Sequence, residues 1–219
     1  MSEASLSLST TIYGRLKRDI LSHCFEPGQK LKVTNLTERY EAGGSPVREA
    51  LSRLAADGLV ESLENRGFRV PRVTRDDLIE LYQTRAWLEE VALTESVRQG
   101  GESWETALVL ASHRLSKVPR TEDGRPSAKW EEAHRAFHVA LISGCGSSWM
   151  IKFCSLLHDQ ADRYRQQALA ASTGKRDIIA EHKEIAEAAA MGDAELAVER
   201  LLAHYDRTRV IILDSDLLE

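Results

Sequence analysis

The spacing of apolar residues separates a short first part of the chain, with mixed patterns, from a longer part that is helical throughout. Residues 10–22 carry apolar side chains at helical intervals, and two shorter helical segments follow at residues 34–40 and 45–56. Apolar and polar residues then alternate over residues 59–63 and 68–73, which is typical of two strands joined by a hairpin. The first part is therefore expected to consist of three helices and a β-hairpin.

The third of these helices has a polar start and a cationic outer side. We expect Ser45 to cap it, with Pro46 in the first helical position, where no N–H is needed. Arg48 and Arg53 lie outside its apolar face and point to water or to a polyanion. That face consists of Val47, Leu51 and Leu54. A short helix with an apolar back and a cationic front fits the major groove of DNA.

The flanking segments complete a winged helix-turn-helix. Thr34 is expected to cap the preceding helix, and residues 41–44 form a glycine-containing turn between the two helices. The hairpin turn at residues 64–67 places Arg66 at the tip of a wing, where it can contact a sugar-phosphate backbone or a minor groove.

Four motifs in this part resemble the winged-helix domain of the GntR transcription regulators, over about residues 8–73. They are residues 27–31, 45–51, 57–60 and 66–70. The resemblance implies that this domain binds DNA, and the expected contacts are Thr34, Ser45, Arg48, Arg53, Asn65, Arg66 and Gly67. Two positions depart from the family. Gly44 and Thr34 stand where the family usually or sometimes carries arginine, which affects the operator sequence rather than DNA binding itself.

The distribution of charge agrees with a DNA-binding first part. The whole chain of 219 residues has a net charge of -5 and is 42% hydrophobic, sufficient for a packed core. Residues 1–75 contain 12 Lys+Arg against 9 Asp+Glu, whereas the remainder contains 17 against 25. Taken alone, this difference could be sampling variation. Together with the winged-helix pattern, this charge difference predicts that an otherwise acidic protein has one basic face, which binds phosphate.

The sequence predicts a cytoplasmic protein. No apolar run approaches the roughly 20 residues that a membrane span needs, and the first residues lack the basic and apolar regions of a signal peptide. Cys24, Cys145 and Cys154 are an odd and scattered set, which suits a reducing compartment better than a disulfide framework.

The second part is expected to be an antiparallel bundle of six helices joined by short polar loops, with no strand after residue 73. The helices are expected at residues 74–98, 104–116, 128–143, 148–170, 175–190 and 194–213. The fold class is therefore mainly α, with a winged-helix domain at residues 8–73 and an all-α regulatory domain at residues 76–213.

Four histidines in the bundle have the spacing of a metal site. His134 and His138 are four residues apart on one helix, so both rings project from one face. His182 and His204 lie at equal distances from the turn at Gly192, which brings them level in an antiparallel hairpin. Such a set suits Zn, Ni or another divalent ion that prefers imidazole. The alternative is that these histidines are packing or surface residues. His23 and His113 are expected to face solvent, and His158 is expected either to line the site or to lie at the surface.

The bundle also resembles the ligand-sensing domain of the fatty-acid-responsive (FCD) branch of the GntR family, over about residues 76–210. The motifs are residues 85–89, residues 134–138, and Glu181-His182 followed by His204. Metal-binding members of this branch use a carboxylate and three histidines, and His134 stands in the place of that carboxylate. This departure either changes the preferred metal or leaves the first ligand position empty.

Arg85 and Arg163 are candidate contacts for an effector, because a guanidinium inside a bundle needs an anion. The simpler partner of Arg85 is Glu89, four residues further on. Sensors of this branch commonly detect small organic acids. Residues 130–147 resemble the carbon-starvation-induced repressors of the branch, which are associated with glutarate and 4-aminobutyrate breakdown, so a dicarboxylate such as glutarate is implied.

The sequence thus predicts a homodimeric transcription regulator. We expect a repressor that binds a palindromic operator and is released by a small carboxylate bound next to a divalent metal. The alternatives are a metal-sensing regulator and a metal-dependent enzyme acting on a small acid. The chain shows no catalytic motif, and Arg135 occupies the place of a general base next to the first histidine, so no catalytic residue is assigned.

Overall fold

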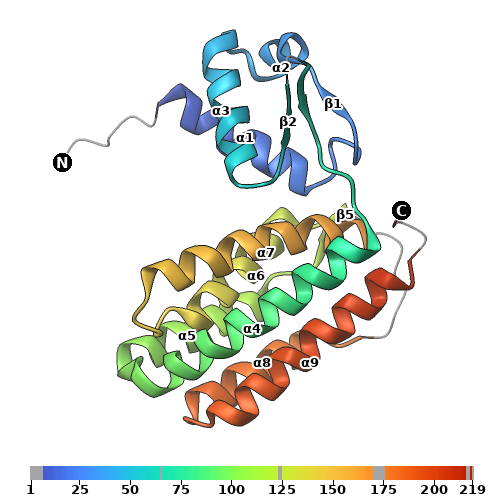
Figure 1. Ribbon diagram of the computed structural model, residues 1–219. Coiled ribbons are helices and arrows are strands. Elements are labelled where there is room, and N and C mark those ends of the chain that lie inside the picture. Colours follow the sequence, from blue (N-terminus) through green and yellow to red (C-terminus); the bar gives the residue numbers. More distant parts are fainter. Residues whose placement is uncertain (1–6, 65, 123–124, 170–175, 216–217, 219) are drawn as a thin grey trace, which may run out of the picture.

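The protein folds into a small domain that rests on a longer helical bundle (Figure 1). The computed structural model describes residues 7–64, 66–122, 125–169, 176–215 and 218. The predicted architecture, a winged helix-turn-helix followed by a bundle that has six helices in its described residues, is confirmed.

The first domain combines three helices with a three-stranded antiparallel sheet in its described residues. The helices are α1 (Leu8–Leu21), α2 (Val33–Tyr40) and α3 (Gly44–Ala56), and the strands are β1 (Lys30–Leu31), β2 (Glu61–Leu63) and β3 (Gly67–Arg69). Strand β3 lies in the middle and pairs Phe68 with both Leu31 and Ser62. The sequence did not predict β1, because two residues carry no alternating pattern. The core of this domain lies beneath the sheet and contains Leu16, Leu51 and Leu59, which are fully buried.

The two helix N-caps predicted in this domain, Thr34 and Ser45, were wrong. Helix α3 begins at Gly44, with extended Gly43 as its N-cap and no side-chain cap bond, so Ser45 lies inside the first turn. Helix α2 likewise follows Lys32, which places Thr34 within the helix and not at its cap. The N–H groups of a first turn have no partner within the helix, so a proline or a hydroxyl residue can stand at any position there.

The bundle consists of long helices with short connections. They are α4 (Arg75–Gln99), α5 (Gly101–Lys117), α6 (Ala128–Ile142), α7 (Ser148–Leu169), α8 (Ile178–Ala190) and α9 (Ala194–Leu213). Thr74 caps α4 as predicted, because its hydroxyl accepts from the backbone N–H of Asp77 at 3.3 Å. The expectation of no strand after residue 73 was wrong. Two-residue strands β4 (Thr121–Glu122) and β5 (Arg125–Pro126) pair in the α5–α6 connection and are too short to give a sequence signal.

The bundle has its own hydrophobic core, distinct from that of the first domain. Val73, at the end of the predicted first domain, packs with this second core. Trp130 and Phe137 of α6 are almost fully buried within it, which fixes the face that α6 turns inward. Among the described residues, no helix is long and apolar enough to cross a membrane.

Two glycines let the end of α6 approach the corner between α4 and α5. A Cβ added at Gly144 would lie 2.9 Å from the Cα of Gly100 and 2.9 Å from the ring of Trp104. The same indole donates to the carbonyl of Ala140 at 3.0 Å. Close backbone contact here sets the position of α6 relative to its neighbours.

We therefore expect Gly144→Ala to destabilise the bundle by about 1–3 kcal/mol, because the added methyl group overpacks this contact. Chemical denaturation would measure the loss. The matched control is Gly14→Ala, since Gly14 lies in a helix with nothing within 4 Å of its added Cβ. That change should stabilise the protein by up to about 1 kcal/mol. Equal effects of the two changes would contradict the close-contact argument.

Candidate metal centre and DNA-reading surface

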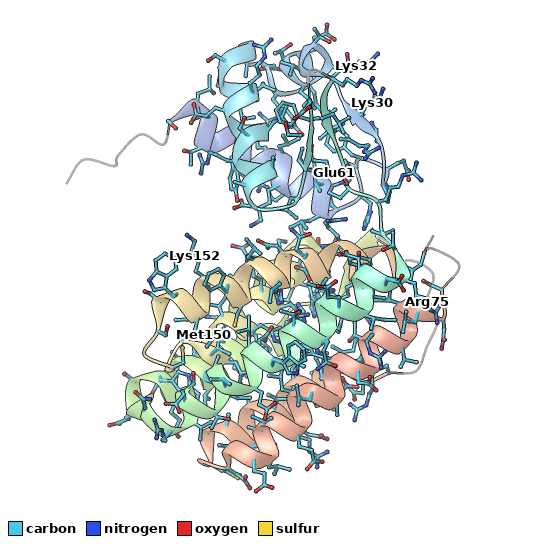
Figure 2. All side chains as sticks on the ribbon, viewed as in Figure 1. Lys30, Lys32, Glu61, Arg75, Met150 and Lys152 are labelled. Carbon is cyan, nitrogen blue, oxygen red and sulfur yellow. The ribbon has the colours of Figure 1, made fainter. Side chains whose placement is uncertain are left out.

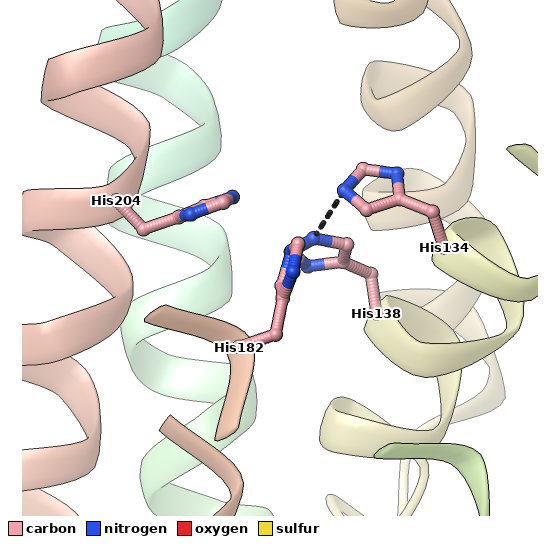
Figure 3. A group of neighbouring side chains, drawn as sticks. All are labelled: His134, His138, His182 and His204. Atoms are coloured by element: carbon pink, nitrogen blue, oxygen red, sulfur yellow. Dashed lines mark hydrogen bonds between the residues drawn. The ribbon is translucent and has the colours of Figure 1, made fainter. Parts of the chain in front are cut away.

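The four histidines predicted from spacing converge inside the bundle. His134 and His138 come from α6, His182 from α8 and His204 from α9 (Figure 3). One ring nitrogen from each lies within 4.8 Å of the others. The Nε2 atoms of His134 and His138 are 3.2 Å apart, and the rings of His182 and His204 are 4.6 Å apart between centroids.

Burial keeps these imidazoles neutral. None of the four is more than 5% exposed. Desolvation lowers the pKa of His134, His138 and His182 well below the usual value, and the neighbouring histidines lower it further. The pKa of His204 is lowered to about 4, mainly by burial, although the Glu181 carboxylate acts in the opposite direction. A neutral imidazole has a free lone pair, which is the form that binds a metal.

Two of the rings are oriented by neighbouring side chains. The Nδ1 atom of His204 lies 2.8 Å from the Glu181 carboxylate, which also accepts from Arg176. The Nδ1 atom of His138 lies 3.2 Å from the Tyr205 hydroxyl, which itself donates to Glu89. In both rings Nδ1 is held by an oxygen and Nε2 is left for the cluster, the arrangement found around metal-binding histidines.

The donor set fits a divalent ion. Nδ1 of His134 and both ring nitrogens of His182 are buried and have no hydrogen-bond partner. Polar atoms are seldom buried without a partner, because each one costs about 1–3 kcal/mol. Four neutral imidazoles suit Zn²⁺, and also Ni²⁺ or Cu²⁺, better than Mg²⁺ or Ca²⁺. These four residues would hold the ion.

His158 of α7, which the sequence left undecided, lies beside this histidine cluster. It is 6% exposed, and its ring lies 5.2 Å from that of His138. Ligand atoms of His134, His158 and Asp162 form a second close set. Burial and the Arg85 guanidinium lower the pKa of His158 to about 3, although Asp162 opposes this. The signal in the sequence was the i,i+4 pair His158–Asp162, which is easily mistaken for a surface pair.

Buried charges surround a small cavity next to the histidines. The cavity has a volume of about 10 Å³ and is lined by Tyr82, Arg85, His134, His138, His158, Ala161, Asp162, Arg165, His204, Tyr205 and Thr208. Arg85 donates to Glu89 at 3.1 Å, which is the simpler partner considered for it. Arg165 donates to Asp162 and to Glu131. Arg165 was not among the effector contacts expected from the sequence.

Arg163, the second predicted effector contact, is not brought to this cavity. Its guanidinium donates to Gln160 at 2.7 Å and to the carbonyls of Pro71 and Arg72 at 3.4 Å. It therefore contacts the segment between the two domains. Successive residues of a helix point in different directions, so Arg163 and Arg165 cannot share one face.

The candidate DNA-reading surface lies on the first domain. Arg48, Ser45, Thr34, Arg66 and Gly67 are all exposed. Asn65 lies outside the described residues. Lys30 and Lys32 are also exposed and extend from the side of the domain farthest from the bundle (Figure 2). Neither lysine was among the DNA contacts expected from the sequence.

Two features of this surface concern individual arginines. A Cβ added at Gly44 would lie 3.3 Å from Nη1 of Arg48, so the missing side chain lets this guanidinium lie against the start of α3. Arg53 is engaged within the domain. It donates to the Thr10 hydroxyl at 3.2 Å and lies 4.4 Å from the centre of the Tyr13 ring.

Comparison with known proteins identifies the family. The family model for bacterial regulatory proteins of the gntR family matches residues 8–70, and the FCD domain matches residues 80–207. The chain belongs to the GntR family and carries the FCD domain, as its sequence motifs indicated. It is a DNA-binding transcription regulator and not an enzyme.

Two curated relatives and one solved structure illustrate the similarity. The chain is 37% identical to the uncharacterized HTH-type transcriptional regulator BphR of Paraburkholderia xenovorans (strain LB400), over 97% of this chain and 88% of that protein. It is 36% identical to the HTH-type transcriptional repressor GlaR of Escherichia coli (strain K12), over 70% of each. The E. coli McbR/YncC structure shares the fold, with a TM-score of 0.80 at 21% identity, and covers 95% of this chain and 98% of that one.

Proposed function

We propose that the protein is a cytoplasmic repressor that binds a palindromic operator as a homodimer and leaves it when a small carboxylate binds beside a divalent metal. The observation that carries this proposal is the cluster of four buried histidines with unpartnered ring nitrogens in a DNA-binding regulator. The similarity to a relative named as a repressor supports the sign of regulation.

The charges around the cavity favour an anionic effector. Arg85 and Arg165 face Glu89, Asp162 and Glu131, which leaves one excess negative charge. A divalent ion held by neutral histidines would reverse this balance to one positive charge. Because uncompensated buried charge is unfavourable, an anion that contacts the metal and a guanidinium completes the site.

The cavity is small, about 10 Å³, which is room for an ion or one water molecule. A short dicarboxylate such as glutarate therefore enters only when the surrounding helices move apart, with one carboxylate at the metal and the other at Arg85 or Arg165. Charge-assisted and bidentate contacts are the strong ones for such a group.

The first test is metal content followed by DNA release. Untagged protein is expected to contain close to one equivalent of Zn or Ni per chain by elemental analysis. A duplex selected by the protein from a random pool then serves as operator, and its affinity is measured with glutarate, succinate and acetate. Release by a dicarboxylate supports the proposal. If only adding or removing the metal changes operator affinity, the metal-sensor alternative is correct. A protein that contains no metal and whose operator affinity does not change with any of the three acids contradicts both the proposal and this alternative.

Arg48 is proposed as a major-groove contact of α3. It is exposed and lies opposite the buried Val47, Leu51 and Leu54. Arg48→Ala is expected to cost about 1–3 kcal/mol of operator affinity at fixed salt, with no change in melting temperature. Glu49→Ala is a poor control because Glu49 accepts from Ser9. Ser52→Ala, at another exposed position of α3, is better. Equal operator affinity of Arg48→Ala and the wild type would remove Arg48 from the interface.

The homodimer is proposed to form through exposed apolar side chains on α4 and α7. These are Trp87, Val91, Trp149 and Phe153, which are 62%, 50%, 66% and 51% exposed. A palindrome presents two equivalent half-sites, so the occupant of this surface is a second copy of the chain in an isologous contact.

The double change Trp149→Ala and Phe153→Ala is expected to raise the dimer dissociation constant at least about 30-fold, because a buried interfacial aromatic commonly contributes about 2 kcal/mol or more. Analytical ultracentrifugation over a dilution series would measure it. Met191→Ala is the control, since Met191 is 82% exposed and lies at the α8–α9 turn. An unchanged dimer would place the interface elsewhere.

A further inference from the structure

Helix α7 lies between the histidine cavity and the DNA-binding domain and contacts both. On one side, His158, Asp162 and Arg165 line the cavity. On the other side, Asp159 and Gln160 contact the first domain. In Figure 1, α7 runs along the part of the bundle that faces this domain. A rotation or shift of α7 therefore moves its cavity-lining residues and the residues that contact the first domain together.

The first link runs through the Asp159 carboxylate, which forms two ion pairs with cations from two other helices. Asp159 is 6% exposed and accepts from Lys17 of α1 through Oδ2 and from Arg135 of α6 through Oδ1. Arg135 directly follows the cluster residue His134. A ligand that draws His134 towards the other three histidines also displaces Arg135, its partner Asp159 and, through it, Lys17.

The second link reaches the end of the proposed recognition helix. The Gln160 amide donates to the carbonyl of Asp57 at 2.7 Å, and Asp57 is the C-cap of α3. The side chain of Asp57 accepts from Tyr13 of α1 at 2.5 Å. A Cβ added at Gly58 would lie 3.1 Å from Nε2 of Gln160, so the contact is close. Gln160 thus touches α3 at the end opposite Arg48.

We propose that α7 transmits occupancy of the histidine cavity to the recognition helix through two links. One is the pair of ion pairs that Asp159 makes with Lys17 and Arg135, and the other is the Gln160–Asp57 hydrogen bond. This rests on the proposed function, because it needs a ligand in the cavity. His158 of α7 and His134 of α6 face the cavity, whereas Asp159 and Arg135, the next residue of each helix, form the link to the first domain. Occupancy changes the spacing of α6 and α7 and, through Lys17 and Gln160, the tilt of the first domain.

The test measures coupling rather than affinity. Operator binding is determined for metal-free protein, for protein with zinc, and for protein with zinc plus glutarate. The largest ratio of dissociation constants among these states is the coupling factor, expected at about tenfold or more for the wild type. In Lys17→Met and in Gln160→Ala the factor is expected to fall to within about twofold of unity. Zinc binding should stay at the wild-type value, which separates loss of transmission from damage to the metal site.

Arg18→Met is the matched control, because Arg18 is exposed on the same helix as Lys17. It removes one positive charge and should weaken operator binding equally in all three states, leaving the coupling factor unchanged. Wild-type coupling in both Lys17→Met and Gln160→Ala would overturn the proposal. Failure of the wild type to bind zinc would instead overturn the proposed function. A wild type that binds zinc but shows no coupling would leave the metal site standing and remove the role of α7.

Discussion

Replacing His182 by alanine is expected to remove nearly all bound metal from the purified protein. His182 is 2% exposed, and both of its ring nitrogens lack a partner within the protein. Its ring stands between those of His134 and His204, at 4.9 Å and 4.6 Å between centroids. Loss of one of four ligands should lower metal affinity more than the roughly 10–100-fold typical of an outer-shell partner.

The same change should leave the metal-free fold intact. No hydrogen-bond partner of His182 is left unsatisfied, so the remaining effect is a small cavity. His113→Ala is the control, because His113 is exposed on α5 and lies outside the cluster. Metal content by elemental analysis and melting curves with and without chelator give both readouts. Full metal occupancy in His182→Ala would remove this residue from the site.

The convergence of the four histidines could be predicted because it depends on distances along the chain. Four residues bring His134 and His138 to one helix face, and equal distances from Gly192 bring His182 and His204 level. The observed cluster has these four members. The roles of Tyr205 and His158 could not be predicted in this way. They depend on how α7 and α9 are rotated against α6, which only the packed core determines.

The helix starts show a different limit. Thr34 and Ser45 satisfy the composition of an N-cap, yet the caps are Lys32 and Gly43. Neither observed cap uses a side-chain bond, so the preference on which the prediction rested does not operate there. At Thr74 the hydroxyl does accept from the backbone, and the prediction was correct.

Arg85 is the residue for which the sequence left two roles open, and the structure gives it a protein partner. Its guanidinium and the Glu89 carboxylate are 4% and 3% exposed and lie 3.1 Å apart. The guanidinium also lies 4.1 Å from the centre of the Tyr205 ring. The pair borders the cavity, so an effector carboxylate at Arg85 would compete with Glu89.

Arg85→Met is expected to destabilise the metal-free protein by about 3–5 kcal/mol, because it leaves the Glu89 charge buried without its cation. The double change Arg85→Met and Glu89→Met removes both charges and should cost clearly less than Arg85→Met alone. Urea denaturation of the three proteins measures the difference. A single change that costs less than about 0.5 kcal/mol would show that the pair is solvated in solution.

The competition between Glu89 and an effector gives the second half of this prediction. Glu89→Gln keeps the shape of the side chain but removes the charge that holds Arg85. If a ligand carboxylate takes the place of Glu89, this variant should bind glutarate more tightly than the wild type, while Arg85→Met should bind it at least about tenfold more weakly, as expected for one lost charge-assisted contact. Calorimetric titration of zinc-loaded protein distinguishes these outcomes. Weaker binding in both variants would mean that the pair only supports the cavity wall. An effector that does not contact Arg85 would not bind more tightly when Arg85 loses its pairing with Glu89.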